Sequence, residues 1–318
     1  MKVLVTGANG FVGRSLCEQL MDLEYSVRGA LRRAGLPEEC RGFEQVVVGD
    51  IGPVTNWEKA LAGVDCVVHL AARVHVMNDR VDNPLAEFRR VNLDGTIRLA
   101  EQACSIGIQR FVYLSTIKVN GDETCGTPFS AADQPFPLNP YGVSKAEAED
   151  YLLEKVGRDC MEVVIIRPPL VYGSGVKANF QKMMQCLVSG IPLPLGAIHN
   201  KRSLVAVENL VGLIVTCIEH PAAANQVFLA GDGEDLSTTE LLQRLGVALG
   251  KPVHLLPVPQ WLVESGLRML GKGDVAQRLC SSLQVDISKA RDLLGWRPSI
   301  SVDEGLKKTA DWYLKQKK

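Results

Sequence analysis

Short apolar segments alternate with longer amphipathic segments through the first two-thirds of the chain. Apolar, β-branched stretches predict six strands, over Lys2–Thr6, Ser26–Ala30, Gln45–Val48, Cys66–Leu70, Arg110–Ser115 and Glu162–Arg167. Helical spacing of apolar residues predicts helices between them, over Val12–Asp22, Trp57–Leu61, Leu85–Ser105 and Ser144–Lys155. Several strand segments are continuously apolar, which is typical of parallel strands covered on both faces. The pattern therefore predicts an α/β fold with a doubly wound parallel sheet.

The pattern changes after Arg167. Gly, Pro and Lys become frequent in 173–177 and 190–196, and helical spacing dominates from Ser237 onward. We therefore expect a sheet domain over residues 1–168 and a smaller mixed, mainly helical domain over residues 169–318. The apolar segment Val227–Ala230 can add a strand to the main sheet, so a return segment near 203–230 is expected as well.

Composition narrows the class of protein. The 318 residues are 46% hydrophobic and 22% charged with a formal net charge of −1, which is ordinary for a soluble protein. Without a cationic excess, no nucleic-acid partner is expected. The apolar run Leu210–Ile218 is about half the length needed to span a bilayer, and Val3–Val5 is too short for the core of a signal peptide. We therefore expect a cytoplasmic protein with no membrane partner.

The nine cysteines are scattered singly, with neither a CxxC pair nor zinc-type spacing. The odd number and the size of the chain favour reduced thiols over a disulfide framework. The five histidines do not cluster with acids in the sequence, so no metal is expected.

Three glycines follow the first predicted strand in the spacing G-x-x-G-x-x-G. Gly7 permits a tight turn, Gly10 allows the backbone to approach a pyrophosphate at the N-terminus of the next helix, and Gly13 allows close packing of helix on strand. In an alternating chain, this position predicts a Rossmann-type dinucleotide site.

The end of the second predicted strand bears on which dinucleotide binds. An acid there would hold the ribose hydroxyls of NAD, whereas the chain has Arg32 and Arg33, which suit the 2′-phosphate of NADP. NADP is therefore the predicted cofactor, with NAD as the alternative. Asp50 follows the third strand, where it can accept from the adenine amino group, and small residues end the fourth strand at 71–72.

A tyrosine and a lysine stand four residues apart at the start of a predicted helix, as Tyr141 and Lys145. That spacing places both on one helix face. A nearby lysine cation favours the phenolate and brings the tyrosine pKa, ordinarily about 10, toward neutral pH. Tyr141 is thus a candidate proton acceptor or donor for a substrate hydroxyl, and Thr116, at the end of a strand, can hold the same oxygen.

Together these motifs resemble the extended short-chain dehydrogenase/reductase superfamily, in its nucleotide-sugar epimerase/dehydratase/reductase branch. The resemblance spans nearly the whole chain and rests on Thr6–Gly13, Asp50–Ile51, Leu70–Ala72, Val91–Asn92, Thr116, Tyr141 with Lys145, Arg167–Pro168 and Gly295–Pro298.

The resemblance implies roles for individual residues. Lys145 would also bind the nicotinamide ribose, Tyr141 and Thr116 would contact the reacting sugar oxygen, and Asn92 would support the site. The implied cofactor-binding residues are Gly7, Asn9, Gly10, Phe11, Val12, Arg32, Asp50, Ile51, Leu70, Ala71, Ala72, Asn92, Ser115, Tyr141, Lys145 and Pro168.

The same resemblance implies a nucleotide-sugar substrate. Asn179 and Arg202 are candidates for binding its diphosphate, and Arg278 is a weaker one, since the arginine fork donates two parallel hydrogen bonds to phosphate. Arg73 and His75 are candidates for the sugar pocket. Lys118 is a further candidate, with a surface salt bridge as the alternative.

One departure from the family pattern bears on the reaction. Related 4,6-dehydratases have an Asp-Glu pair just after the catalytic threonine, where this chain has Ile117 and Lys118, which argues against a dehydratase. The run 115–121 is most similar to a subgroup linked to UDP-glucose 4-epimerases and to 4-keto reductases of 2-acetamido-2,6-dideoxy sugars.

Three functions stay open. The first expectation is an NADPH-dependent 4-keto reductase acting at C4 of a UDP-sugar, in the synthesis of polysaccharide precursors. The alternative is a UDP-sugar 4-epimerase with tightly bound NAD. A non-catalytic dinucleotide sensor is the third, and the joint presence of Tyr141, Lys145 and Thr116 argues against it. A homodimer is implied by the resemblance, formed through the helices over Leu85–Ser105 and Ser144–Lys155.

Overall fold

The computed structural model describes residues 1–34, 42–74, 83–158 and 160–316. Its centre is a seven-stranded parallel sheet in the order β3-β2-β1-β4-β5-β6-β9. The strands are β1 (Lys2–Thr6), β2 (Ser26–Leu31), β3 (Glu44–Val47), β4 (Cys66–His69), β5 (Arg110–Leu114), β6 (Glu162–Arg167) and β9 (Gln226–Leu229). All six predicted strands are present, with ends displaced by at most one residue.

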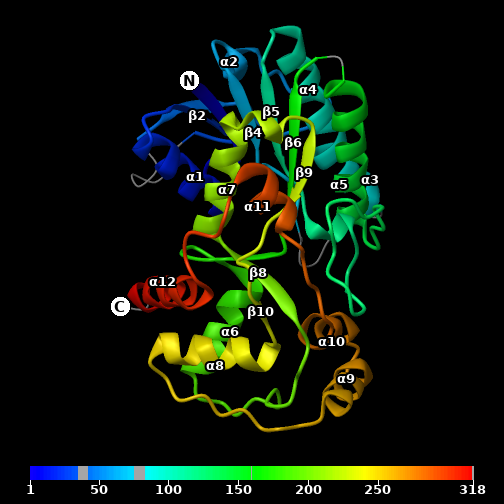
Figure 1. The fold of residues 1–318 in the computed structure, drawn as a ribbon, viewed down its shortest axis with the longest axis vertical. Coiled ribbons are helices and arrows are strands. Elements are labelled where there is room, and N and C mark those ends of the chain that lie inside the picture. The colour runs from blue at the N-terminus through cyan, green and yellow to red at the C-terminus, as the bar shows by residue number, and fades with distance from the viewer. Residues whose placement is uncertain (35–41, 75–82, 159, 317–318) are drawn as a thin grey trace.

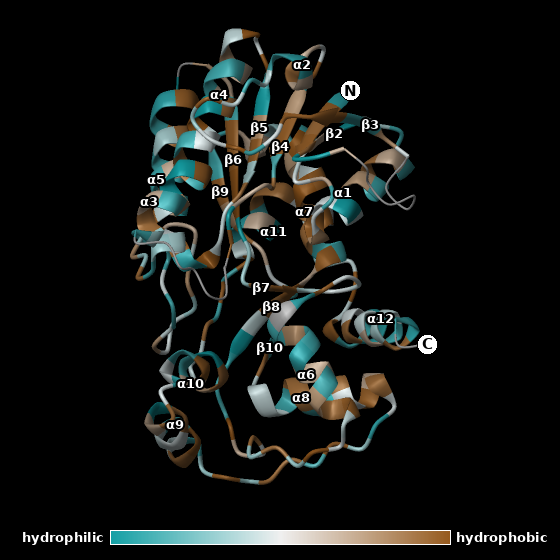
Figure 2. Cartoon of the chain, turned by 180° about the vertical axis from the view of Figure 1, so that it is seen from behind, coloured by the Kyte–Doolittle hydropathy of each residue, from teal (hydrophilic) through white to brown (hydrophobic). Residues whose placement is uncertain are grey.

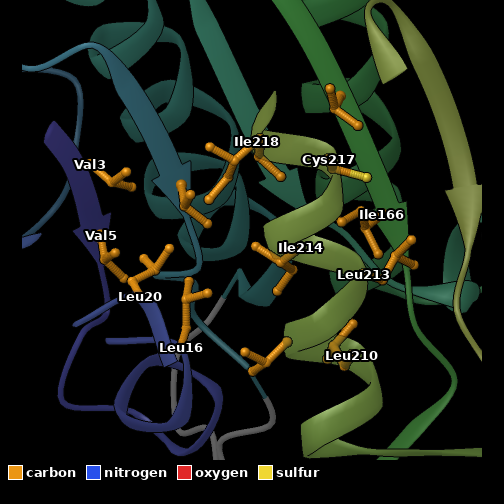
Figure 3. Close-up of a cluster of buried hydrophobic side chains, with 14 of the residues drawn as sticks. Val3, Val5, Leu16, Leu20, Ile166, Leu210, Leu213, Ile214, Cys217 and Ile218 are labelled. Atoms are coloured by element: carbon orange, nitrogen blue, oxygen red, sulfur yellow. The ribbon is translucent and has the colours of Figure 1, made fainter. Parts of the chain in front are cut away.

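Helices α1 (Phe11–Asp22) and α7 (Val207–Glu219) cover much of one face of this sheet. Their apolar side chains meet those of the strands in a single cluster, in which Leu16 and Ile214 are fully buried. Figure 3 shows α7 pointing a row of aliphatic side chains toward the sheet. A segment from the second half of the chain thus completes the core that begins at residue 2, because a parallel sheet needs both faces covered.

Helices α2 (Glu58–Leu61), α4 (Gly95–Ser105) and α5 (Pro140–Tyr151) lie over the opposite face, and α3 (Pro84–Arg89) packs beside α5 (Figure 1). In Figure 2, α7 is mostly hydrophobic, whereas α5 has both hydrophobic and hydrophilic residues. The helix predicted over 85–105 is divided by the π-helical turn Arg90–Asp94. A π turn of this kind often marks a functional site, and this one contains Asn92. Helix α5 begins at Pro140 because Asn139 caps it through the amide of Gly142.

A second, three-stranded sheet lies beyond the carboxyl ends of the main strands (Figure 1). Its order is β10 (Asp235–Leu236), β8 (Arg202–Ala206) and β7 (Leu170–Tyr172). The remaining helices are α6 (Ala178–Val188), α8 (Thr238–Leu249), α9 (Gln260–Met269), α10 (Gly273–Cys280), α11 (Ser288–Leu294) and α12 (Val302–Lys315).

Helix α11 packs on the main sheet, where its Ala290 and Leu294 join the cluster of α1 and α7. The other five helices and the small sheet share an apolar cluster of their own, which includes Phe180, Leu242 and Leu306. The chain then returns to the main sheet with β9, which pairs in parallel with β6. The division into domains over 1–168 and 169–318 stays a prediction.

The cysteines correct one expectation. Cys104, in the last turn of α4, and Cys160, just before β6, form a disulfide with their Cα atoms 5.7 Å apart. Their separation of 56 residues gave no sign of this contact, which arises because α4 and β6 both lie beside β5. Among the described cysteines, Cys66, Cys125, Cys186, Cys217 and Cys280 are free thiols. Within the described ranges, no helix is long and apolar enough to cross a bilayer.

Candidate active site

A cavity of about 1110 Å³ opens at the carboxyl ends of β1, β2, β4 and β5. Strands β1 and β4 are neighbours where the strand order reverses, which is where open α/β sheets bind their ligands. Most of the predicted cofactor residues line this cavity, namely Gly7, Asn9, Gly10, Phe11, Val12, Arg32, Asp50, Ile51, Leu70, Ala71, Ala72, Ser115 and Tyr141. The volume is large enough for a dinucleotide.

The glycine turn is built for a close approach. Gly7 has φ +69°, and a side chain there would lie 3.0 Å from the backbone nitrogen of Ala71. A Cβ at Gly13 would lie 2.1 Å from the carbonyl oxygen of Gly7, so helix and turn are in contact. These positions tolerate glycine alone, as the sequence pattern predicts.

The N-terminus of α1 has no side-chain cap, unlike those of α5, α8 and α12. Asn139, Ser237 and Ser301 cap α5, α8 and α12 through their side chains. In α1 the N-cap is Gly10, which has no side chain to accept the first amides, and the first turn contains no acid. The free amides and the positive end of the helix dipole therefore face the cavity, where a pyrophosphate fits.

The far end of the cavity holds an ion pair between two predicted cofactor residues. Arg32 Nε lies 3.1 Å from Asp50 Oδ1, and their side chains are 72% and 77% exposed. The sequence has no acid at the end of β2, but the tertiary structure places the carboxylate of Asp50 beside Arg32. Arg32 is therefore not a free cation in this structure.

Lys145 is buried behind the cavity wall, with two contacts to β5. Its Nζ donates to the carbonyl oxygen of Leu114 at 2.7 Å and lies 3.8 Å from the ring centroid of Tyr113. Burial lowers the pKa of Lys145 to about 7, against the carboxylate of Glu149, which raises it. The lysine can therefore exchange its proton near neutral pH.

The pKa of Tyr141 differs from the value expected from the sequence. Burial raises the pKa of its phenol to about 12, and the hydrogen bond from Thr116 opposes this only in part. Thr116 accepts from the amide of Lys118 at 3.3 Å, so its own proton is available to the phenol oxygen. The prediction that Lys145 brings this pKa toward neutral is wrong for this structure, because desolvation dominates.

A buried ion pair follows on the same face of α5. Glu149 and Arg167 have side chains only 2% and 4% exposed, and the Nε of Arg167 donates to both carboxylate oxygens at 3.0 and 3.1 Å. Arg167 also donates to Asn120 Oδ1 at 2.9 Å. Burial raises the pKa of Glu149, and the hydrogen bond from Arg167 lowers it. The pair fixes α5 against the end of β6.

Asn92 connects the π-helical turn to α5. Its Nδ2 donates to Ser144 Oγ and to the carbonyl oxygen of Arg73, both at 3.0 Å, and its Oδ1 accepts from the amide of Arg73 at 2.8 Å. The side chain is buried and does not line the cavity. Its role is to hold the loop after β4 beside the helix of Tyr141.

The predicted substrate residues are dispersed. Arg73 lines the cavity, with its guanidinium 5.5 Å from the ring centroid of Phe88. Lys118 forms an ion pair with Asp122 at 2.6 Å, the alternative foreseen for it. Asn179 is exposed in the first turn of α6. His75 lies outside the described residues.

Two predicted phosphate ligands come from segments that meet. Arg202, at the start of β8, donates to the carbonyl oxygen of Ser281 at 3.0 Å, and burial lowers its pKa. Ser281 directly follows α10, whose last turn contains the exposed Arg278. The segments that contain the two arginines are therefore in contact, although 76 positions separate the arginines in the sequence.

Pro168 lies outside the cavity lining and is buried, with its carbonyl oxygen accepting from the amide of Ile117 at 2.9 Å. It supports the strand end from which Ser115 and Thr116 project. Several cavity residues were not foreseen, among them Arg14, Val48, Arg90 and Leu114. All but Arg14 and Arg90 lie at or just after a strand end, a signal that the sequence carries. Arg90 is the first residue of the π-helical turn.

The parallel sheet, the uncapped helix after a glycine turn and the Tyr141–Lys145 pair define a dinucleotide-dependent enzyme of the extended short-chain dehydrogenase/reductase class. Residues 3–231 match the model of the NAD dependent epimerase/dehydratase family. The chain belongs to this family.

Similar proteins include a UDP-glucose 4-epimerase from Vibrio cholerae, 49% identical over 98% of this chain and 95% of that protein. A 3-beta-hydroxysteroid dehydrogenase from Mycolicibacterium neoaurum is 28% identical over 98% of this chain and 91% of its own length. The crystal structure of UDP-glucose 4-epimerase from Thermotoga maritima with UDP-glucose superposes with a TM-score of 0.79 at 25% identity, covering 100% of both chains.

Proposed function

We propose that this chain is a UDP-sugar 4-epimerase that uses NAD as a retained cofactor. The observation that carries the proposal is the site itself. Tyr141 lines a dinucleotide cavity, the buried Thr116 is hydrogen-bonded to its phenol, and Lys145 lies buried behind the cavity wall. This arrangement supports proton exchange with one sugar hydroxyl next to a nicotinamide. The half-identical UDP-glucose 4-epimerase of Vibrio cholerae supports the same reaction.

The cofactor fits the residues present. The crevice at Gly7 and Gly13, which a Cβ would fill, and the free amides of α1 suit a pyrophosphate. Asp50 lies beside Arg32 at the end of the cavity that we assign to the ribose. There the carboxylate of Asp50 would repel a 2′-phosphate and accept hydrogen bonds from the ribose hydroxyls. A UDP-glucuronic acid 4-epimerase from Bacillus cereus, 25% identical with a TM-score of 0.79, was solved with UDP-glucuronic acid and NAD.

When bound, NAD would accept the hydride from sugar C4 and return it to the other face. The chain supplies the proton chemistry. The phenol of Tyr141 first loses its own proton to solvent, and the phenolate oxygen then takes the proton of the C4 hydroxyl. Lys145 supports that loss with its charge, and Thr116 holds the oxygen in place. Arg73, on the cavity wall, is the described side chain that we propose contacts the sugar diphosphate or sugar.

The 4-keto reductase expected from the sequence is the second candidate. Arg32 and Arg33 both line the cavity, which favours NADP. The ion pair of Arg32 with Asp50 weakens that argument, because it offsets the charge offered to a phosphate. NADP and the reductase therefore take second place to NAD and the epimerase.

The test is to purify the chain, identify any retained nucleotide by mass spectrometry, and incubate the protein with UDP-glucose and UDP-N-acetylglucosamine without added cofactor. We expect retained NAD and formation of the C4 epimer of at least one substrate, detected by NMR. Stoichiometric NADPH consumption with a 4-keto UDP-sugar and no epimer would replace the epimerase with the reductase.

We also propose a homodimer in which α3–α4 and α5 of two copies form a four-helix interface. The support is the family resemblance and the position of these helices on one side of the molecule (Figure 1). Light scattering of the purified protein tests it, and a monomer mass contradicts it.

A further inference from the structure

His69, the last residue of β4, is fully buried and takes no part in the chemistry described above. Its Nδ1 lies 2.7 Å from Thr6 Oγ1, and its Nε2 lies 3.0 Å from Thr96 Oγ1. Thr6 ends β1 and Thr96 lies in the first turn of α4. One imidazole ring therefore connects two strands of the sheet with the helix that covers them.

The hydrogen bonds around the ring determine its proton. The hydroxyl of Thr96 donates to the carbonyl oxygen of Asn92 at 2.7 Å, so its oxygen accepts from His69 Nε2–H. Nδ1 then has a free lone pair, which accepts from the hydroxyl of Thr6. With its proton so used, the Thr6 oxygen accepts from the amides of Leu70 and Ala71, at 3.2 and 3.1 Å.

The opposite tautomer fails at Thr6. Three hydrogens, from His69 Nδ1 and the two amides, would converge on one oxygen, whose own proton would have no acceptor in these bonds. The surroundings also keep the ring neutral, since burial and the charge of Lys145 lower the pKa of His69 to about 3. The ring is further fixed by Tyr113, stacked on it at 5.7 Å and 21°, and by Phe111 at 5.9 Å. A neutral ring with the proton on Nε2 is the state that satisfies every partner.

The imidazole of His69 positions two parts of the site through its two hydrogen bonds. On one side, its bond to Thr6 orients the oxygen that binds the amides of Leu70 and Ala71, two residues of the cavity wall. On the other side, Thr96 holds the carbonyl of Asn92, whose side chain binds Ser144 on the helix of Lys145. The positions of the cavity wall at Leu70–Ala71 and of helix α5 therefore both depend on the hydrogen bonds of His69.

We propose that His69 is a positioning residue, whose neutral Nε2–H ring sets the cofactor wall at Leu70–Ala71 in register with Tyr141 and Lys145. It touches neither sugar nor dinucleotide. The inference rests on the proposed function for its turnover readout, and on dinucleotide binding alone for a second, independent readout. Misplacement of a reacting group by about 1 Å can cost about 100-fold in rate.

The experiment compares His69→Phe with His69→Asn. Phenylalanine fills the space and loses both bonds, whereas the Oδ1 of asparagine can replace Nδ1 and accept from Thr6. We expect His69→Phe to lower kcat about 100-fold with little change in KM for the UDP-sugar. We also expect weaker NADH binding, measured by calorimetry on protein from which any retained nucleotide has been removed. His69→Asn should recover a large part of both.

Thr309→Val is the matched control for stability. Thr309 is fully buried, and its hydroxyl donates to the carbonyl oxygen of Gly305 within α12, away from the cavity. The Thr309→Val substitution should lower the melting temperature without changing kcat or NADH affinity. Wild-type kcat and NADH affinity in His69→Phe would overturn the proposal, as would equal losses in the phenylalanine and asparagine variants. If wild type turns over no UDP-sugar, the proposed epimerase fails, and NADH affinity alone decides the role of His69.

Discussion

Lys145 Nζ donates to the carbonyl oxygen of Leu114 at 2.7 Å, which attaches helix α5 to the end of β5. The bond helps a buried cation to exist, because the carbonyl dipole replaces part of the lost hydration. Tyr141, one helical turn earlier, is thereby aimed at the cavity whose wall includes Leu114.

Removing the phenol oxygen tests Tyr141. We expect Tyr141→Phe to lower kcat/KM for the UDP-sugar by about 10²–10⁴, the usual contribution of a positioned acid or base. Dinucleotide affinity should stay close to wild type. Tyr151→Phe, on the same helix, is the control, since its hydroxyl bonds Glu101 at the surface at 3.2 Å. Equal activity of the two variants would remove Tyr141 from the mechanism.

The acidity of the Tyr141–Lys145 pair predicts a pH profile. Alone, the phenol titrates near pKa 12 and the lysine near pKa 7, so the pair loses its first proton near pH 7. The form with one proton includes the phenolate beside the cation, which is the base. We therefore expect kcat/KM for a hydroxyl sugar to rise with pH through about 7. In Lys145→Met this rise should vanish, and an unchanged profile would assign the titration elsewhere.

The same shift affects stability. The folded-state pKa of Lys145 lies below its ordinary value, so the unfolded chain binds more protons between about pH 7 and 10.5. Stability from this group therefore increases as pH rises through that window. Urea unfolding of wild type and Lys145→Met at several pH values measures it. The free energy of unfolding of the wild type should rise relative to that of Lys145→Met as the pH becomes more alkaline.

The Asp50–Arg32 pair predicts cofactor preference. Replacing Asp50 with Asn removes the negative charge next to Arg32, so NADPH should bind more tightly and NADH more weakly. Because both groups are exposed, the change should reach about tenfold at most and should shrink as salt is added. Calorimetry with both nucleotides measures the ratio. A preference for NADPH in the wild type would contradict the assignment of NAD.

The disulfide between Cys104 and Cys160 predicts a reductant-dependent stability. Cys104→Ser should lower the free energy of unfolding under oxidising conditions by about 2–4 kcal/mol, because the cross-link restricts the unfolded chain. Cys125→Ser, an exposed free thiol, is the control and should have no such effect. Equal stability of wild type with and without reductant would mean that the two thiols stay unlinked in solution.

Local sequence was enough to predict the strands, from the hydrophobic pattern, and the glycine turn and the Tyr141–Lys145 pair, from residue type and spacing. These features are local, since a period of two or 3.6 residues and an i, i+4 relation are properties of neighbouring positions. The functional residues at strand ends followed, because parallel strands end at one edge of the sheet.

The tertiary structure decided what depends on distant segments and on burial. The pairing of Asp50 with Arg32 and of Cys104 with Cys160 requires contacts between separate elements. The acidity of Tyr141 turned on desolvation by the surrounding core, which outweighed the expected effect of Lys145. A sequence states which charges exist, but the electrostatic cost of each depends on how much water the complete fold removes from it.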